Sequence, residues 1–269
     1  MTISFPAILD APVSGRRVPL VVDHLDYSRR VLLRGNPVPW TDPTALSNFL
    51  NQAHGLLRPD VTLLDLGEFY RLAADDPRLG EAMAARSRTG YALRALLADA
   101  ATTRAVTTLA ATVAGTTRLP LLLQIPSPRS WLAATHPGDV ADLDADRVEA
   151  AAMYVADWLR GFAEVPVAAV LLDERIAPGA AAALPPADPQ SYVPVTNVAA
   201  HYRWEIGLRG EDTVSIGEHE GDVLGSEYWL ADEAAVPDTH GVFRLAHLPA
   251  DAVPETVLAR LAALDGPGA

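Results

Sequence analysis

Polar side chains follow several short apolar runs of this sequence, and they are the residues best suited to chemistry. Asp65, Asp173 and His247 each end or follow such a run. Imidazole titrates near neutral pH, and a carboxylate can exchange a proton or stabilise a positive charge. We therefore predict that these three residues are catalytic. The structural alternatives are a helix cap for Asp65, an ion pair for Asp173 and a buried core histidine for His247.

Further residues near the ends of these runs are candidates to bind a substrate. Because Asp173, Glu174 and Arg175 are consecutive, strand alternation places Asp173 and Arg175 on one side. Arg129 could hold a carboxylate bidentately or pair with a nearby acid. The full set of predicted substrate-binding residues is Asp23, His24, Arg29, Tyr70, Gln124, Arg129, Trp131, Glu174 and Arg175.

A metal site is the other chemistry that the acidic and imidazole side chains allow. Glu218, His219 and Glu220 could join Asp23 and His24 around a cation. Their spacing fits neither His-Glu-x-x-His nor a cysteine-based pattern. We expect a solvated acidic turn at 218–220, and activity that needs neither a tightly bound transition metal nor a cofactor.

The composition of the 269 residues removes several classes of function. The chain has no cysteine and no lysine, since all 21 basic residues are arginine. This excludes thiolate nucleophiles, Cys-ligated zinc, Schiff bases and a P-loop lysine. A formal charge of −13 makes nucleic acid an unfavourable partner.

The ends and the hydropathy of the chain bear on its location. Residues 1–10 lack the pattern of a signal peptide, and no apolar run approaches the roughly 20 residues of a membrane helix. We therefore predict a soluble cytoplasmic protein without a membrane partner, and leave open whether it forms a homodimer.

Apolar runs alternating with helical patterns indicate an α/β fold. Because no Gly-x-Gly-x-x-Gly follows the first run, we favour a barrel over an open dinucleotide-binding sheet. The prediction is a single-domain (β/α)8 TIM-type barrel over residues 1–269, with predominantly parallel strands. One of the eight strands is not found. The seven candidates are residues 18–22, 61–64, 119–125, 165–172, 204–209, 213–216 and 242–246.

Helix signals and one long loop complete the expected barrel. Asp42, followed by proline, is typical of a helix start. Asp146 and Glu149 have the spacing of a capping box. Residues 79–115 contain two helical patterns. The Ala/Pro-rich stretch 176–189 is long enough to be a lid over the strand ends.

The last strand candidate carries a family resemblance. Gly-Val-Phe-Arg-Leu-Ala-His at 241–247, followed by Pro-Glu at 254–255, resembles the end of uroporphyrinogen decarboxylases, where an aliphatic-Phe-Asn-Leu-Gly-His strand precedes a Pro-Glu helix start. Asp65 lies where that family carries its strand-two aspartate. Residues 119–132 look like the family's strand with an Ala-Pro-Trp-Thr-Leu stretch. The resemblance implies a TIM-type barrel and decarboxylation.

A second resemblance is to cobalamin-independent methionine synthases, which share this barrel superfamily. Leu-Leu-Asp-Glu at 171–174 is similar to their Asp-Glu-Pro strand. Their zinc site needs cysteines, so thiol methylation by that route is excluded here. The Arg-Gln-Ala-Gly-Arg-Tyr motif of the decarboxylases is absent, with only Arg29 and Arg30 in a comparable place, and Leu248 replaces a glycine. These departures put a substrate with many carboxylates in doubt.

The function that the resemblance implies is a cofactor-independent C–C lyase acting on a small carboxylated molecule. Asp65 would stabilise a cationic intermediate, Arg129 or Arg29 would hold the carboxylate, and His247 would move the proton. One alternative is a methyltransferase of the same superfamily that uses a folate or a corrinoid-protein partner. The other is a catalytically inactive barrel that binds a metabolite or a protein.

Overall fold

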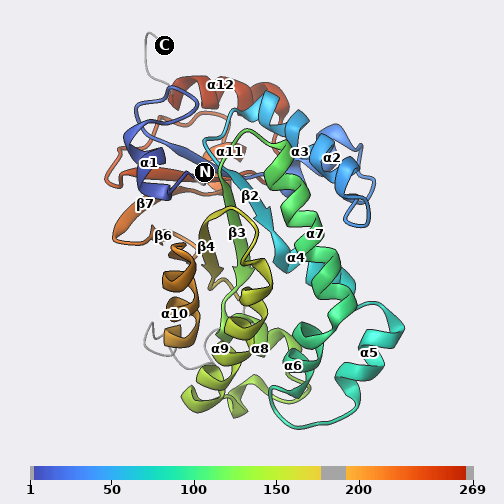
Figure 1. The fold of residues 1–269 in the computed structure, drawn as a ribbon. Coiled ribbons are helices and arrows are strands. Elements are labelled where there is room, and N and C mark those ends of the chain that lie inside the picture. The colour runs from blue at the N-terminus through green and yellow to red at the C-terminus, as the bar shows by residue number, and fades with distance from the viewer. Residues whose placement is uncertain (1–2, 177–191, 265–269) are drawn as a thin grey trace.

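The computed structural model describes residues 3–176 and 192–264, whose arrangement Figure 1 shows. Its centre is an eight-stranded sheet in the order β1-β8-β7-β6-β5-β4-β3-β2. The strands are β1 (Leu20–Asp23), β2 (Thr62–Asp65), β3 (Leu121–Pro126), β4 (Val167–Asp173), β5 (Glu205–Arg209), β6 (Thr213–Ile216), β7 (His219–Leu224) and β8 (Phe243–His247).

The two edges of the sheet meet, so that it forms a nearly closed barrel. Asp60, just before β2, donates its backbone N–H to the carbonyl oxygen of Leu20 in β1 at 2.8 Å. The Asp60 carboxylate in turn accepts the backbone N–H of Leu20 at 2.8 Å. Asp60 thus joins β1 to β2 where no regular ladder is formed. An α/β fold with an eight-stranded barrel is confirmed.

The sheet is mixed, which corrects the prediction of predominantly parallel strands. Strand β6 pairs antiparallel with both β5 and β7, and the remaining pairings are parallel. The reason is the length of the connections at 210–212 and 217–218, because a parallel crossover needs about a dozen residues or more. Helices therefore do not alternate with strands through β5, β6 and β7, as a strict (β/α)8 barrel would require.

The strand that the sequence analysis did not find is β7. It begins at His219, inside the stretch expected to be a solvated acidic turn, and only 217–218 form that turn. Gly217 has a φ of +61°, a left-handed conformation that glycine adopts without strain. The strand is not evident from the sequence because Glu220 and Asp222 share one face of β7, where Glu220 is exposed and Asp222 half-buried.

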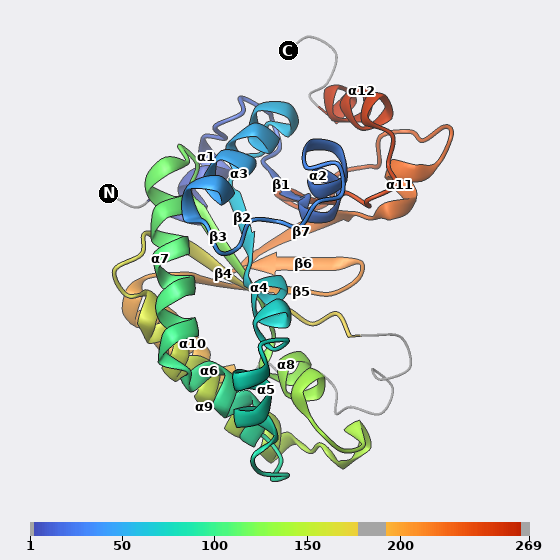
Figure 2. The same cartoon turned by 90° about the vertical axis from the view of Figure 1, so that its right-hand side faces the viewer.

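Helices α3, α7, α9 and α10 form an outer layer along strands β2 to β5 (Figure 2). No helix among the described residues is both long and apolar enough to span a bilayer. The helices are α1 (Phe5–Asp10), α2 (Leu25–Leu32), α3 (Pro43–Leu57), α4 (Leu66–Ala73), α5 (Pro77–Ala84), α6 (Tyr91–Ala98), α7 (Ala100–Thr116), α8 (Pro128–Thr135), α9 (Ala145–Leu159), α10 (Val193–Tyr202), α11 (Ser226–Leu230) and α12 (Pro254–Leu264).

Capping side chains set several helix starts. Asp42 accepts the backbone N–H groups of the next turn and begins α3, as predicted. Asp99 caps α7, so the predicted pair of helices at 79–115 is the three helices α5, α6 and α7. Helix α9 is capped by Asp144 rather than Asp146, which lies in the first turn, where its charge favours the helix dipole. The predicted lid at 176–189 lies almost wholly outside the described residues.

Apolar side chains fill the barrel from within and separate it from the helices. Interior residues from different strands form one cluster that includes Val21, Leu63, Leu122, Leu171 and Leu245. Phe5 and Ile8 of α1 belong to the same cluster. Each such side chain contributes about 1.5–3 kcal/mol through burial. The interior cluster lies directly below the polar residues at the carboxyl ends of the strands.

Candidate active site

Six polar side chains lie at the carboxyl ends of the strands, each two residues after an interior position of the same strand. Because alternate strand residues share a face, the residue two positions after an interior side chain also faces the interior. Leu63 thus leads to Asp65, and Leu245 to His247. The same step leads to the rest of the set on β1, β3, β4 and β5. These residues are Asp23, Gln124, Asp173 and Arg209.

His247 is oriented by Asp23, its neighbour in the β1–β8 register. The imidazole Nδ1 lies 2.9 Å from Oδ2 of Asp23 and donates its hydrogen there. Arg209 approaches the same carboxylate oxygen at 2.8 Å. Burial raises the pKa of Asp23, but the hydrogen bond from His247 and the charge of Arg209 outweigh it, so the pKa lies well below its usual range. With Nδ1 engaged, Nε2 is the imidazole nitrogen of His247 that makes no hydrogen bond to another described residue.

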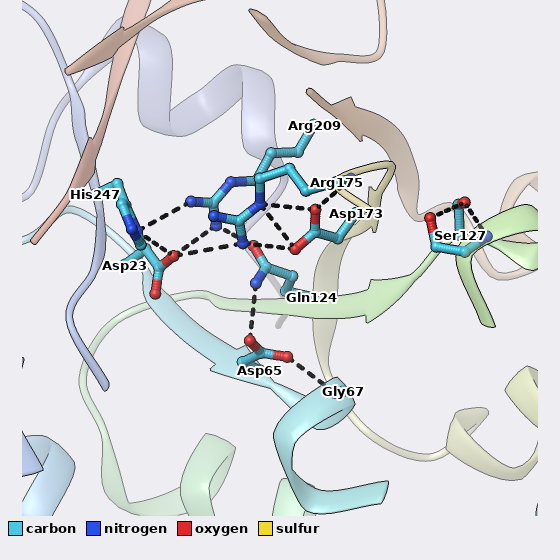
Figure 3. A network of polar contacts seen from close by, with 10 residues as sticks. Asp23, Asp65, Gly67, Gln124, Ser127, Asp173, Arg175, Arg209 and His247 are labelled. Atoms are coloured by element: carbon cyan, nitrogen blue, oxygen red, sulfur yellow. Dashed lines mark hydrogen bonds and ion pairs between the residues drawn. The ribbon is translucent and has the colours of Figure 1, made fainter. Parts of the chain in front are cut away.

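Arg209 also determines the orientation of Gln124. Its Nη1 donates to Oε1 of Gln124 at 2.6 Å, and the side chain of Arg209 is only 1% exposed. The amide nitrogen of Gln124 therefore faces the other way and donates to Oδ2 of Asp65 at 3.0 Å. Figure 3 shows the resulting chain from His247 through Asp23, Arg209 and Gln124 to Asp65.

Asp65 has the electrostatic environment of a proton-exchanging group. Burial, and then the charges of Asp23 and Asp173, raise its pKa from 3.8 to about 7, against smaller opposing effects of hydrogen bonds from Gln124 and the Gly67 backbone. Asp65 therefore exists in both protonation states near neutral pH. It also caps α4 through the Gly67 N–H at 2.9 Å, which is the structural alternative expected from the sequence. Its catalytic role stays a prediction.

Asp173 and Arg175 form an ion pair beside this chain. Nε and Nη2 of Arg175 donate to the Asp173 carboxylate, at 2.9 and 2.6 Å. Nη2 also lies 3.8 Å from Oδ2 of Asp23, which connects the pair to the network. The side chain of Arg175 is 23% exposed, so it can still reach a ligand. Asp65, Gln124, Asp173 and His247 thus converge at the carboxyl ends of the strands.

The residue that the sequence analysis missed is Arg209, which links both halves of the network. It ends the predicted strand 204–209, and Gly207 precedes it by one strand period. A Cβ at Gly207 would come within 2.8 Å of the Leu171 side chain, so this position faces the interior. The rule that selected Asp65 and His247 would have selected Arg209, had it been applied to every strand.

Glu174 and Arg129 form a second ion pair next to the network. Nη1 of Arg129 donates to Glu174 at 3.0 Å, and the hydroxyl of Tyr192 donates to the other carboxylate oxygen. Glu174 follows Asp173 and so faces away from the barrel interior. Ser127, which Figure 3 shows at the end of β3, caps α8 through the backbone N–H of Ser130. Arg129 is therefore tied to Glu174 rather than placed to clamp a substrate.

Tyr70 and Trp131 are corrections to the predicted substrate-binding set. They are 1% and 3% exposed and lie in the core between sheet and helices. The Trp158 indole N–H donates to the Tyr70 oxygen at 2.6 Å, and the rings of Tyr70 and Trp131 pack edge to face. Both residues follow strand-end segments, but the helical turn points them away from the barrel mouth.

Replacing Tyr70 with phenylalanine tests this correction. The change orphans the buried Trp158 N–H, so we expect a loss of about 1–3 kcal/mol in the free energy of unfolding. Turnover per folded molecule should stay within about twofold, because no reacting group is lost. Urea unfolding and activity on the same preparation measure both. A variant of full stability with strongly reduced turnover would return Tyr70 to the site.

Arg29 and His24 are also placed outside the network. Arg29 lies on the exposed side of α2, near Asp26. His24 is 3% exposed, bonds to Ser28 through Nδ1 at 3.0 Å and packs edge to face on His54. Burial lowers the pKa of His24 to about 4 and that of His54 to about 3, so both imidazoles are neutral.

Metal ligands and cavities point to no other site. Within 3–176 and 192–264, no group of three or more acidic, imidazole or thiol side chains is placed to hold a metal ion. Cavities of about 400 and 700 Å³ lie among the outer helices, one beside Met153 and one beside Trp40. We place the site at the strand ends because the bonded ionisable groups lie there, and the outer cavities hold no such network.

Comparison of the chain with protein-family models, with curated proteins and with solved structures finds no match. The function is therefore argued from the geometry of the strand ends.

Proposed function

We propose that this chain is an acid–base lyase of the decarboxylase type. The observation that carries the proposal is Asp65, a carboxyl group with a pKa of about 7, joined through Gln124 and Arg209 to the Asp23–His247 pair. Two proton-exchanging groups at one barrel mouth are suited to decarboxylation. One can add a proton to a carbon of the substrate, and the other can supply the hydrogen that replaces the carboxylate.

The proposed reaction begins with protonated Asp65. It gives its proton to an electron-rich carbon of a substrate whose carboxylate Arg175 holds. The ionised Asp65 then lies beside the cation and stabilises it. The C–C bond to the carboxylate breaks, its electron pair neutralises the cation, and CO2 leaves. His247 then gives a proton through Nε2 to the carbon that has lost CO2, and takes up another from solvent. The first carbon returns its proton to Asp65, which restores the protonated acid. The net change consumes one proton and replaces the carboxylate with hydrogen.

Release of CO2 tests this proposal. A panel of electron-rich carboxylic acids, such as ring acetates and β-keto acids, is incubated with the protein, and CO2 is measured. The proposal expects release from at least one acid, and none above background from the Asp65→Asn variant. Equal release by both proteins, or none from the whole panel, would overturn it.

His247→Asn isolates the role of the exposed imidazole nitrogen. Asparagine keeps an N–H near the position of Nδ1, where it can still donate to Asp23, and removes Nε2. We expect turnover to fall by about 10²–10⁴-fold, the usual contribution of a positioned acid–base group. Stability should change by less than about 1 kcal/mol, because the side chain is 35% exposed. A variant that unfolds early but keeps its specific activity would make His247 structural.

The two alternatives predict different ligands. A methyltransferase would be stabilised against heat by folates rather than by carboxylic acids, and a thermal shift assay separates the two. An inactive binding barrel is disfavoured because buried charges such as Arg209 and Asp23 cost desolvation energy. A cytoplasmic location stays a prediction from the sequence, and the oligomeric state stays open.

A further inference from the structure

The arginines at the barrel mouth are already paired with carboxylates. Arg209 bonds to Asp23 at 2.8 Å, and Arg175 bonds to Asp173 at 2.6 Å. Just outside the network, Arg129 pairs with Glu174. A ligand carboxylate would therefore add a negative charge that the described residues of the mouth do not neutralise.

Among the arginines described at the barrel mouth, Arg175 alone retains an edge that a ligand can reach. Its Nε and Nη2 are used by Asp173, whereas its Nη1 makes no hydrogen bond to another described residue. Arg209 is 1% exposed, and Arg129 is 11% exposed and tied to Glu174. The unbonded Nη1 of the 23% exposed Arg175 can donate to one carboxylate, and a second carboxylate would meet no accessible donor edge among these arginines.

Asp65 is the group that can absorb the added charge. Asp23, Asp173 and Arg175 act on it from β1 and from the end of β4, and Gln124 and the Gly67 N–H contact it from β3 and α4. Arg209 and His247 are connected to Asp65 less directly, because Arg209 bonds to Gln124 and His247 bonds to Asp23. Asp65 is buried between Asp23 and Asp173, and burial together with their charges raises its pKa to about 7. Another negative charge nearby makes its ionised form still less favourable.

We propose that the site binds substrates with a single carboxylate, and that binding is coupled to the uptake of one proton by Asp65. This inference rests on the location of the proposed function but not on its reaction. Substrate binding would thereby keep Asp65 protonated, and protonated Asp65 is the proton donor that the proposed decarboxylation needs. A polycarboxylate would require further uncompensated charge and would be rejected.

Calorimetric titration tests the inference with phenylacetate as the probe. The dependence of the heat on the ionisation enthalpy of the buffer gives the number of protons taken up. Near pH 8 we expect an uptake approaching one proton, and the dissociation constant should rise about tenfold per pH unit above about 7. Asp65→Asn should bind with no uptake and a flat pH profile. Asp212→Asn, an exposed control on the β5–β6 turn, should behave like wild type.

Matched probes decide the substrate class. Phenylacetamide, which lacks the charge, should bind without proton uptake, and ortho-phenylenediacetate, which carries two carboxylates, should bind at least about tenfold more weakly than phenylacetate. Binding of phenylacetate without uptake, tighter binding of the diacid, or no binding of phenylacetate at millimolar concentration would overturn the inference. Uptake without CO2 release from any acid would leave it standing while the proposed reaction fails. CO2 release without proton uptake on binding would leave the proposed reaction standing and overturn the inference.

Discussion

Replacing Asp65 with asparagine is expected to abolish turnover and, at the same time, to stabilise the protein at alkaline pH. The loss of activity follows from the loss of the proton donor, and we expect a fall of about 10²–10⁴-fold or more. The gain in stability follows because the native fold keeps this carboxyl group in an environment that disfavours its charge. The two effects have one cause, which is the burial of Asp65 beside Asp23 and Asp173.

The direction of the pH effect follows from the raised pKa of Asp65. The folded protein binds this proton up to about pH 7, whereas the unfolded chain releases it near 3.8. The stabilisation that the proton provides is complete below 3.8 and is lost as pH rises through 7. A shift of about 3 pKa units corresponds to about 4 kcal/mol. The asparagine side chain of the variant does not titrate, so its free energy of unfolding does not fall in this way as pH rises. The altered hydrogen bond to Gln124 offsets part of this advantage.

Urea unfolding of wild type and Asp65→Asn at several pH values measures this effect. The difference in unfolding free energy should move in favour of the variant as pH rises from about 4 to 8. Asp212→Asn, which removes an exposed carboxylate, is the control for the change in net charge. A variant whose stability runs parallel to wild type across this range would contradict the raised pKa.

Replacing Arg209 with methionine should destabilise the fold more than any other substitution at the site. The change leaves Asp23 buried without its ion pair at 2.8 Å and frees the Gln124 oxygen. Removing one partner of a buried pair costs about 3–5 kcal/mol. Without the charge of Arg209, burial raises the pKa of Asp23, so the penalty should be largest at high pH and shrink as Asp23 takes up a proton.

A double-mutant cycle measures this coupling. Asp23→Asn combined with Arg209→Met removes both charges and should recover part of the lost stability. Arg71→Met, which breaks the exposed pair with Glu68, is the matched control and should have a small effect. Arg209→Met with stability close to wild type, or a double variant no better than the single one, would show that Arg209 does not hold the network.

Strand ends were the part of the site that the sequence could reveal. Val21, Leu63 and Leu245 face the barrel interior, and the polar residue two positions later faces the same way. This local periodicity places Asp65 and His247 together although they are far apart in the chain. Arg209 ends a predicted strand, and the same periodicity applied to that strand would have placed it at the site. What the strand pattern does not show is its burial. Its burial depends on Asp23 and Gln124, which long-range folding brings beside it.

The errors in the predicted fold and site also have physical causes. The sequence predicts a turn in place of the start of β7 because His219 and Glu220 are polar. Their antiparallel pairing with Ile216 and Ser215 of β6 shows that they belong to a strand. Tyr70 is predicted at the site only from its position in the sequence. Whether an aromatic ring after a strand turns toward the mouth or the core depends on the helix that follows, and α4 turns Tyr70 onto Trp158.

A site-resolved titration decides whether Asp65 exchanges a proton near neutral pH. Carbon-13 labelling of the aspartate carboxyl groups, with Asp65→Asn to assign the resonance, follows this one group by NMR as pH changes. The account predicts a midpoint near 7, with burial as its main cause. A midpoint near 3.8, the ordinary value for aspartate, would contradict the proposed acid–base site.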